Sequence, residues 1–175
     1  MTVIPDSEIK ESISSAVGKL IHEGRIRLDW DQSSVYSVYI LQMDDNVWRC
    51  RKCSRNLGED FRDNSAFYVG MTKKSRAERI QEHRESYRHH QSGMSSAAQN
   101  KEFWTRGAKM TREHGFETAE ELEPLDLDGG SLDGRLRKDD AKLLEQIVIP
   151  TALRVLGFAA YAGAAEEFVA ISKAK

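Results

Sequence analysis

Five side chains that lie far apart in the chain could together bind an anion and transfer a proton. Arg79 and His83 are four residues apart, so on a helix they occupy one face. Tyr39 and Tyr68 lie in two segments rich in β-branched and aromatic residues, and Glu145 has mainly apolar neighbours. If folding brings these five together, one site would hold a fixed cation, a carboxylate and three groups able to exchange protons.

The chemistry of these groups suits a phosphate ester. Arg79 carries a planar, permanently charged fork that matches phosphate oxygens, and Glu145 offers the hard oxygen ligands that Mg²⁺ prefers. Either Tyr39 or His83 could accept a proton from water. Taken singly, each residue also has an ordinary interpretation: strand tyrosines pack, helical arginine and histidine lie in solvent, and carboxylates lie at the surface. Only their joint order favours a site.

Two strands and a capped helix are predicted to position four of the five residues. The strands lie at 35–43 and 66–69, and the second strand ends at Gly70. Ser75 and Glu78 have the spacing of a capping box, so a helix should begin there and carry Arg79 and His83.

Further helices are expected on either side of this centre. Apolar residues recur at helical spacing over 6–23, and Gly24 is a plausible C-terminal stop. A helix over 140–156 would carry Glu145, with Pro150 marking a kink or an end. Shorter helices are predicted at 100–110 and 164–173, and the acidic stretch 117–140 is expected to be mainly loop.

Basic residues concentrate in the middle of an acidic chain. The 175 residues hold 26 Lys and Arg against 28 Asp and Glu, yet residues 46–113 contain 15 basic and 8 acidic side chains. Such a distribution suits a phosphate-facing surface, although a solvated surface gives the same pattern. Within it, a polar insertion at 44–65 could contact nucleic acid through four basic residues, Arg49, Arg51, Lys52 and Arg55. Lys73 and Lys74, just before the predicted helix cap, could contact the flanking nucleic-acid backbone.

The two cysteines, Cys50 and Cys53, form a single CxxC within that insertion. They supply half of a structural zinc site, which would need His89, His90, His114 or a second chain to complete it. Free reduced thiols are the alternative, and we take them as the default. One CxxC does not make a disulfide framework. Because no signal core or membrane-length apolar run is found, a cytoplasmic location without membrane contact is expected.

The motifs resemble those of the GIY-YIG nuclease family. The resemblance rests on SVYIL (37–41), FYVGMT (67–72), SRAERIQEH (75–83), the glutamate in DAKLLEQIVIP and the closing LRVLGFAAYAG. It covers residues 35 to about 163. Ser37 stands where the family has a glycine in the first motif. The resemblance implies that Tyr39, Tyr68, Arg79, His83 and Glu145 are the catalytic residues, with Glu145 holding Mg²⁺ or Mn²⁺. It favours Tyr39 as the general base, assisted by His83.

The implied fold is α+β, with a small, mainly antiparallel, three-stranded sheet flanked by helices. Residues 1–34 would form an N-terminal helical extension, 35–163 the nuclease-like domain with its insertion, and 164–175 a C-terminal helix or tail. The expected function is metal-dependent endonuclease action on DNA, most simply double-stranded, by a monomer or a homodimer. An inactive nucleic-acid-binding module and a protein-interaction domain on the same scaffold are the alternatives.

Overall fold

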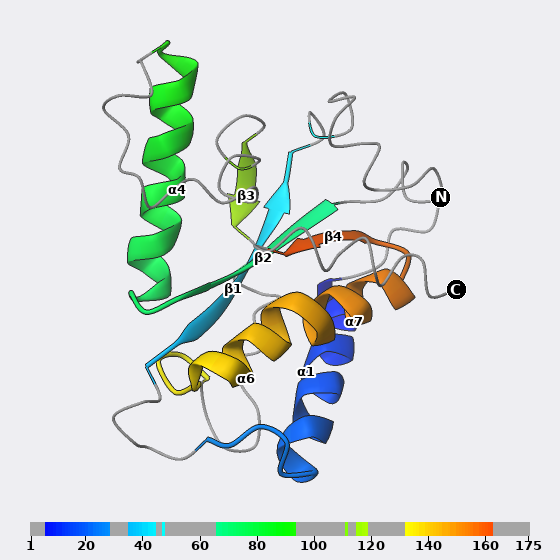
Figure 1. The fold of residues 1–175 in the computed structure, drawn as a ribbon. Coiled ribbons are helices and arrows are strands. Elements are labelled where there is room, and N and C mark those ends of the chain that lie inside the picture. The colour runs from blue at the N-terminus through cyan, green and yellow to red at the C-terminus, as the bar shows by residue number, and fades with distance from the viewer. Residues whose placement is uncertain are drawn as a thin grey trace.

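The structure, a computed structural model, describes residues 6–28, 35–44, 47, 66–93, 111, 115–118 and 132–162. Its elements, shown in Figure 1, are α1 (Asp6–His22), β1 (Ser37–Met43), β2 (Ala66–Thr72), α4 (Arg76–Gln91), β3 (Phe116–Thr118), α6 (Lys138–Leu143), the π-helical turn η5 (Leu144–Val148), α7 (Ile149–Val155) and β4 (Ala159–Ala162). The predicted helices at 100–110 and 164–173, and nearly all of the 44–65 insertion, lie outside the described residues.

Within the described part of the chain, the sheet has four strands in the order β3-β1-β2-β4. The α+β prediction is confirmed, and the expected antiparallel arrangement is correct for β3, β1 and β2. It is wrong for β4, which pairs parallel to β2 over 66–69 and 159–162, so the sheet is mixed. The parallel pairing arises because the chain crosses over through α6, η5 and α7 before it enters β4.

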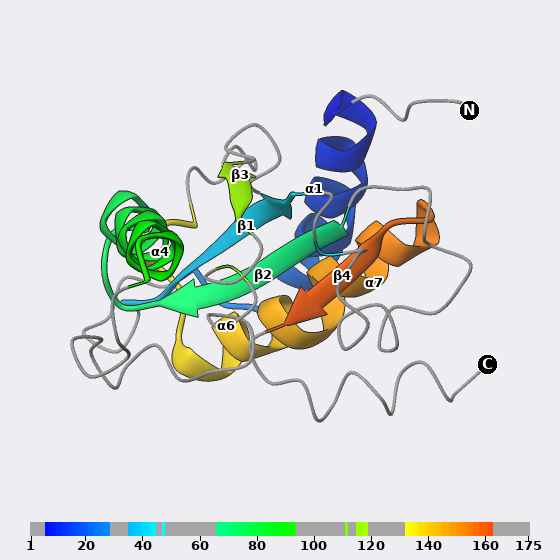
Figure 2. The same ribbon diagram turned by 90° about the horizontal axis from the view of Figure 1, so that it is seen from above.

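Side chains of each strand alternate between the two faces of the sheet. Val38 and Ile40 of β1 join a core with α1, η5 and α7, while Tyr39 and Leu41 face a second cluster that includes Ile80 of α4. Figures 1 and 2 show α4 on one side of the sheet and α1 with α7 on the other. The alternation of side-chain direction along β1 therefore points Tyr39 toward the helix that carries Arg79 and His83.

Helix α1 packs into the main core of the domain. Its residues Ile9, Ile13, Val17 and Leu20 are buried as their helical spacing predicts, and α1 packs against α7 and η5. Gly24 has a φ of 69°, so it ends the helix in the left-handed conformation expected of a C-terminal glycine. No helix among the described residues is long and apolar enough to cross a membrane.

Helix α4 begins with the predicted capping box. The Ser75 hydroxyl accepts a hydrogen bond from the Glu78 backbone N–H, and the Glu78 carboxylate accepts one from the Ser75 backbone N–H. These bonds satisfy the backbone N–H groups of Ser75 and Glu78, which have no carbonyl partner in a preceding helical turn. The start of α4, and with it the angular position of Arg79 and His83, is thereby fixed by local sequence.

The helix that carries Glu145 is interrupted by a π-helical turn. Helical structure runs from Lys138 to Val155, close to the predicted 140–156, but residues 144–148 are wound more widely. The Ile149 N–H donates to the Leu144 carbonyl, five residues back. Pro150 has no N–H, and in a regular α-helix its ring would collide with the carbonyl four residues before it. The wider turn just ahead of Pro150 relieves that collision.

Candidate active site

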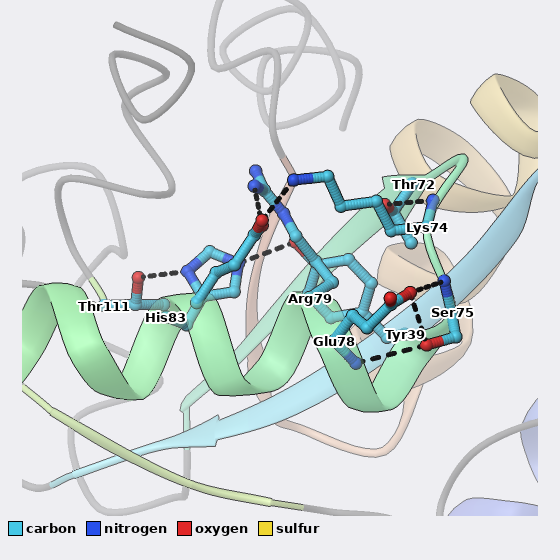
Figure 3. Close-up of polar contacts among 9 residues, drawn as sticks. Tyr39, Thr72, Lys74, Ser75, Glu78, Arg79, His83 and Thr111 are labelled. Atoms are coloured by element: carbon cyan, nitrogen blue, oxygen red, sulfur yellow. Dashed lines mark hydrogen bonds and ion pairs between the residues drawn. The ribbon is translucent and has the colours of Figure 1, made fainter. Parts of the chain in front are cut away.

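Tyr39, Arg79 and His83 form a hydrogen-bonded group at the interface between β1 and α4 (Figure 3). The Tyr39 hydroxyl lies 2.8 Å from His83 Nε2, and it accepts a hydrogen bond of 3.4 Å from Arg79 Nε. Tyr39 and His83 are both almost completely buried. The tyrosine oxygen is therefore held between a permanent cation and an imidazole, in a place sheltered from bulk water.

Gly70 lies directly opposite Tyr39 in the β1–β2 pairing. A Cβ atom at position 70 would clash with the Tyr39 hydroxyl and with the ring carbon that bears it. Because the Tyr39 phenol is buried and hydrogen-bonded, it has little room to move away. The glycine that ends the second motif is thus required by the close approach of the Tyr39 side chain.

His83 is an uncharged member of the group. Burial, followed by the nearby charge of Arg79, lowers the pKa of His83 from 6.5 to about 3. Its second nitrogen, Nδ1, lies 3.0 Å from the Thr111 hydroxyl. Each ring nitrogen is paired with one hydroxyl, and in a neutral imidazole one nitrogen donates while the other accepts. Sequence reasoning missed Thr111, because a single threonine outside any motif gives no signal.

Tyr68 packs edge-on against both members of the pair. Its ring centroid lies 6.1 Å from that of Tyr39 and 5.9 Å from that of His83. Burial raises the pKa of Tyr68 well above 10, and the charges of Tyr39 and Glu145 raise it further. Burial also raises the pKa of Tyr39, but the Arg79 charge and hydrogen bond oppose that increase. Tyr39 is therefore the tyrosine that is better placed to lose a proton.

Glu145 brings a buried carboxylate within electrostatic reach of both tyrosines. It lies in η5, which packs against β2, and only 6% of it is exposed. Its charge raises the pKa of Tyr39 and of Tyr68. Among the described residues, no three His, Cys, Asp or Glu side chains come together as a metal cage. A single carboxylate nevertheless fits Mg²⁺, which usually keeps several waters and takes its other ligands from substrate phosphate.

The predicted phosphate-contacting lysines lie at the start of α4. Lys73 Nζ sits 5.4 Å from the centre of the Tyr36 ring, and Lys74 pairs with Glu82. Glu82 also accepts a hydrogen bond of 2.9 Å from Arg79 Nη1. His89 and His90 are exposed near the far end of α4. Of the other predicted residues, the basic group of the insertion (Arg49, Arg51, Lys52 and Arg55), Cys50, Cys53 and His114 lie outside the described residues.

Ser37, at the start of β1, anchors a turn. Its side chain is buried, and its hydroxyl accepts a 2.7 Å hydrogen bond from the Gly134 backbone N–H. Arg76 of α4 reaches the same turn, with its Nε 3.3 Å from an Asp133 carboxylate oxygen. The turn just before the Glu145 helix is therefore tied to both β1 and α4. A glycine at position 37 could not make this bond.

No family model, no curated protein and no solved structure matches the chain.

Proposed function

We propose that the chain is a metal-dependent endonuclease of the GIY-YIG kind, which hydrolyses phosphodiester bonds in DNA. The observation that carries this proposal is the Tyr39 hydroxyl held between Arg79 and His83. The buried Glu145 carboxylate, whose charge acts on the same tyrosine, adds a metal ligand of suitable chemistry. All four side chains lie on elements that follow one another in the order of the family motifs.

Arg79 is the residue best suited to bind the scissile phosphate. Its guanidinium is permanently charged and largely enclosed, with 14% of the side chain exposed, so its attraction for an anion is weakly screened. Bound at Glu145, Mg²⁺ or Mn²⁺ would acidify water and neutralise charge that builds up on the phosphate. Lys73 and Lys74 lie at the same end of α4 and extend the positive surface along a bound backbone.

Tyr39 is proposed as the proton acceptor for the attacking water. His83 carries no charge at neutral pH, so before reaction it is a neutral hydrogen-bonding partner of Tyr39. In one tautomer Nε2 accepts from Tyr39 and Nδ1 donates to Thr111, while the Tyr39 oxygen accepts from Arg79 and Tyr68, so an attacking water would have to replace one of these two donors. As the Tyr39 oxygen takes a proton from water, the proton of its own hydroxyl would pass to His83 Nε2, and His83 would carry it as a transient imidazolium until it is returned.

Plasmid nicking by the purified protein tests this function. We expect Mg²⁺-dependent nicking, stopped by EDTA and reduced about 100-fold or more by Glu145→Gln or Arg79→Lys. The matched control is Glu85→Gln, because Glu85 lies on the same helix and pairs only at the surface with Gln81. Intact plasmid over a range of DNAs, divalent metals and salt concentrations would contradict the proposal. DNA binding without cleavage would select an inactive binding module instead.

A further inference from the structure

One carboxylate bridges Lys74 and Arg79, the cation that contacts the proposed base. Glu82 Oε1 pairs with Lys74 Nζ, and Glu82 Oε2 accepts from Arg79 Nη1 at 2.9 Å. The same guanidinium donates through Nε to the Tyr39 hydroxyl. Lys74 comes from the connection just before α4 and Arg79 from the first turns of that helix, and Figure 3 shows the ends of their side chains lying near each other.

A carboxylate between a lysine and an arginine occupies the kind of position that a phosphate would take. Both anions present oxygens at similar separations to the same N–H donors, and arginine binds either one through charged hydrogen bonds. Desolvation acts to raise the pKa of Glu82, but its hydrogen bonds to Lys74 and Arg79 and their charges outweigh this and lower it. Glu82 is therefore ionised at neutral pH and remains paired with both cations.

We propose that Glu82 is a built-in competitor for substrate: in the free protein it occupies the phosphate-binding position of Lys74 and Arg79, and a phosphodiester must displace it. This inference rests on the proposed function, because it takes Arg79 to be the phosphate ligand. Glu82 is 24% exposed and lies on the outer part of α4, so its side chain can swing into solvent when an anion arrives. A single weak phosphate would compete poorly with this internal carboxylate, whereas a polyanion with several contacts would displace it readily.

A role in positioning alone would give the opposite result. If Glu82 served only to orient Arg79, replacing it would loosen the guanidinium and weaken phosphate binding. If Glu82 competes with phosphate, replacing it removes a rival anion and strengthens binding. The amide of Glu82→Gln keeps the size and hydrogen-bonding capacity of the side chain while removing its charge.

The test compares Glu82→Gln with Glu85→Gln, which changes the net charge equally on the same helix. Binding of a short DNA duplex is followed by fluorescence anisotropy without divalent metal, at several salt concentrations. We expect Glu82→Gln to bind about three- to tenfold more tightly than Glu85→Gln, the range that two partly exposed ion pairs account for. For Glu82→Gln, the slope of log affinity against log salt concentration should also be steeper, by about the amount that one phosphate contact contributes. Equal or weaker binding by Glu82→Gln would overturn the proposal.

A second measurement separates this inference from the nuclease proposal. Inorganic phosphate is titrated into each protein while the NMR signal of the Arg79 side-chain N–H, assigned by its loss in Arg79→Lys, is observed. If Glu82→Gln saturates at a severalfold lower phosphate concentration than Glu85→Gln, the proposal that Glu82 competes with phosphate is supported even if no plasmid is cleaved. Unchanged phosphate affinity in a protein that does cleave plasmid would overturn the competitor and leave the nuclease proposal standing.

Discussion

His83 shows at the scale of one residue how burial changes what a side chain can do. On an exposed helix face it would titrate near neutral pH, but here it is enclosed beside Arg79 and has a pKa of about 3. Its two nitrogens are hydrogen-bonded to the hydroxyls of Tyr39 and Thr111, so the neutral imidazole holds both hydroxyls in fixed directions. Gly70 contributes by leaving space for the Tyr39 phenol that His83 holds.

The depressed pKa makes His83 a source of pH-dependent stability. The unfolded chain binds a proton at this histidine below about pH 6.5, while the folded chain does so only below about pH 3. Stability from the neutral imidazole is therefore fully present above pH 6.5 and is lost as the pH falls toward 3. We expect the free energy of unfolding to decline by up to about 1.4 kcal/mol per pH unit in this window from His83 alone.

Urea denaturation at pH 7, 5 and 4 measures this decline. His83→Gln should remove the contribution of His83, so the free energy of unfolding should vary less with pH than it does in the wild type. The control is His89→Gln, because His89 is exposed on the same helix and should leave the curve unchanged. A curve that keeps its slope in His83→Gln would show that His83 is not the group responsible.

At the scale of the element, the π-helical turn decides how Glu145 is presented. Leu144 and Ile149 are both fully buried although they are five residues apart. On a regular α-helix that separation turns the second side chain by about 140° from the first, whereas a wider turn brings the two closer to one side. The π turn thus keeps both apolar residues in the core while Glu145, between them, is also buried.

We expect Pro150→Ala to reduce nicking activity about tenfold with only about 1–2 kcal/mol of lost stability. Alanine restores the missing N–H and removes the ring, so the segment can return to α-helical pitch and change the direction of Glu145. Activity, urea denaturation and far-UV circular dichroism are measured together. Thr151→Ala, at the exposed neighbouring position, is the control. Full activity in Pro150→Ala would mean that core packing alone maintains the turn.

At the scale of the whole molecule, the site depends on a core that lies on the other face of the sheet. Helix α1 packs against α7 and η5, so the first helix of the chain supports the segment that carries Glu145. Tyr39, Arg79 and His83 lie on the α4 side, and the sheet connects the two layers. Stability of the N-terminal helix and integrity of the site should therefore be coupled.

Ile13→Ala tests that coupling. Ile13 is fully buried, and its truncation should lower the free energy of unfolding by about 3 kcal/mol through lost burial and a residual cavity. Because α1 belongs to the main core, tyrosine fluorescence and far-UV circular dichroism should report one shifted transition. The exposed Glu11→Ala on the same helix should change stability by less than about 0.5 kcal/mol. If α1 unfolded by itself while the rest of the domain stayed folded, the coupling would be contradicted.

The sequence by itself determined the local elements of this protein. Apolar spacing predicted α1, Gly24 predicted its end, and Ser75 with Glu78 predicted the start of α4. Arg79 and His83 follow on one face of that helix because four residues make about one helical turn. These features depend on neighbours close in the chain, so their physical causes can be read without a fold. The same reasoning located an interruption near Pro150 but could not give its form.

Only the tertiary structure decided which distant groups meet. The strand register places Gly70 opposite Tyr39, and a shift of one residue would direct every side chain of β1 to the other face. The contacts of Thr111 with His83 and of Ser37 with Gly134 depend on packing between separate elements. The parallel pairing of β4 follows from the path of the preceding helices. Such pairings join residues far apart in the chain, and short-range propensity carries no information about them.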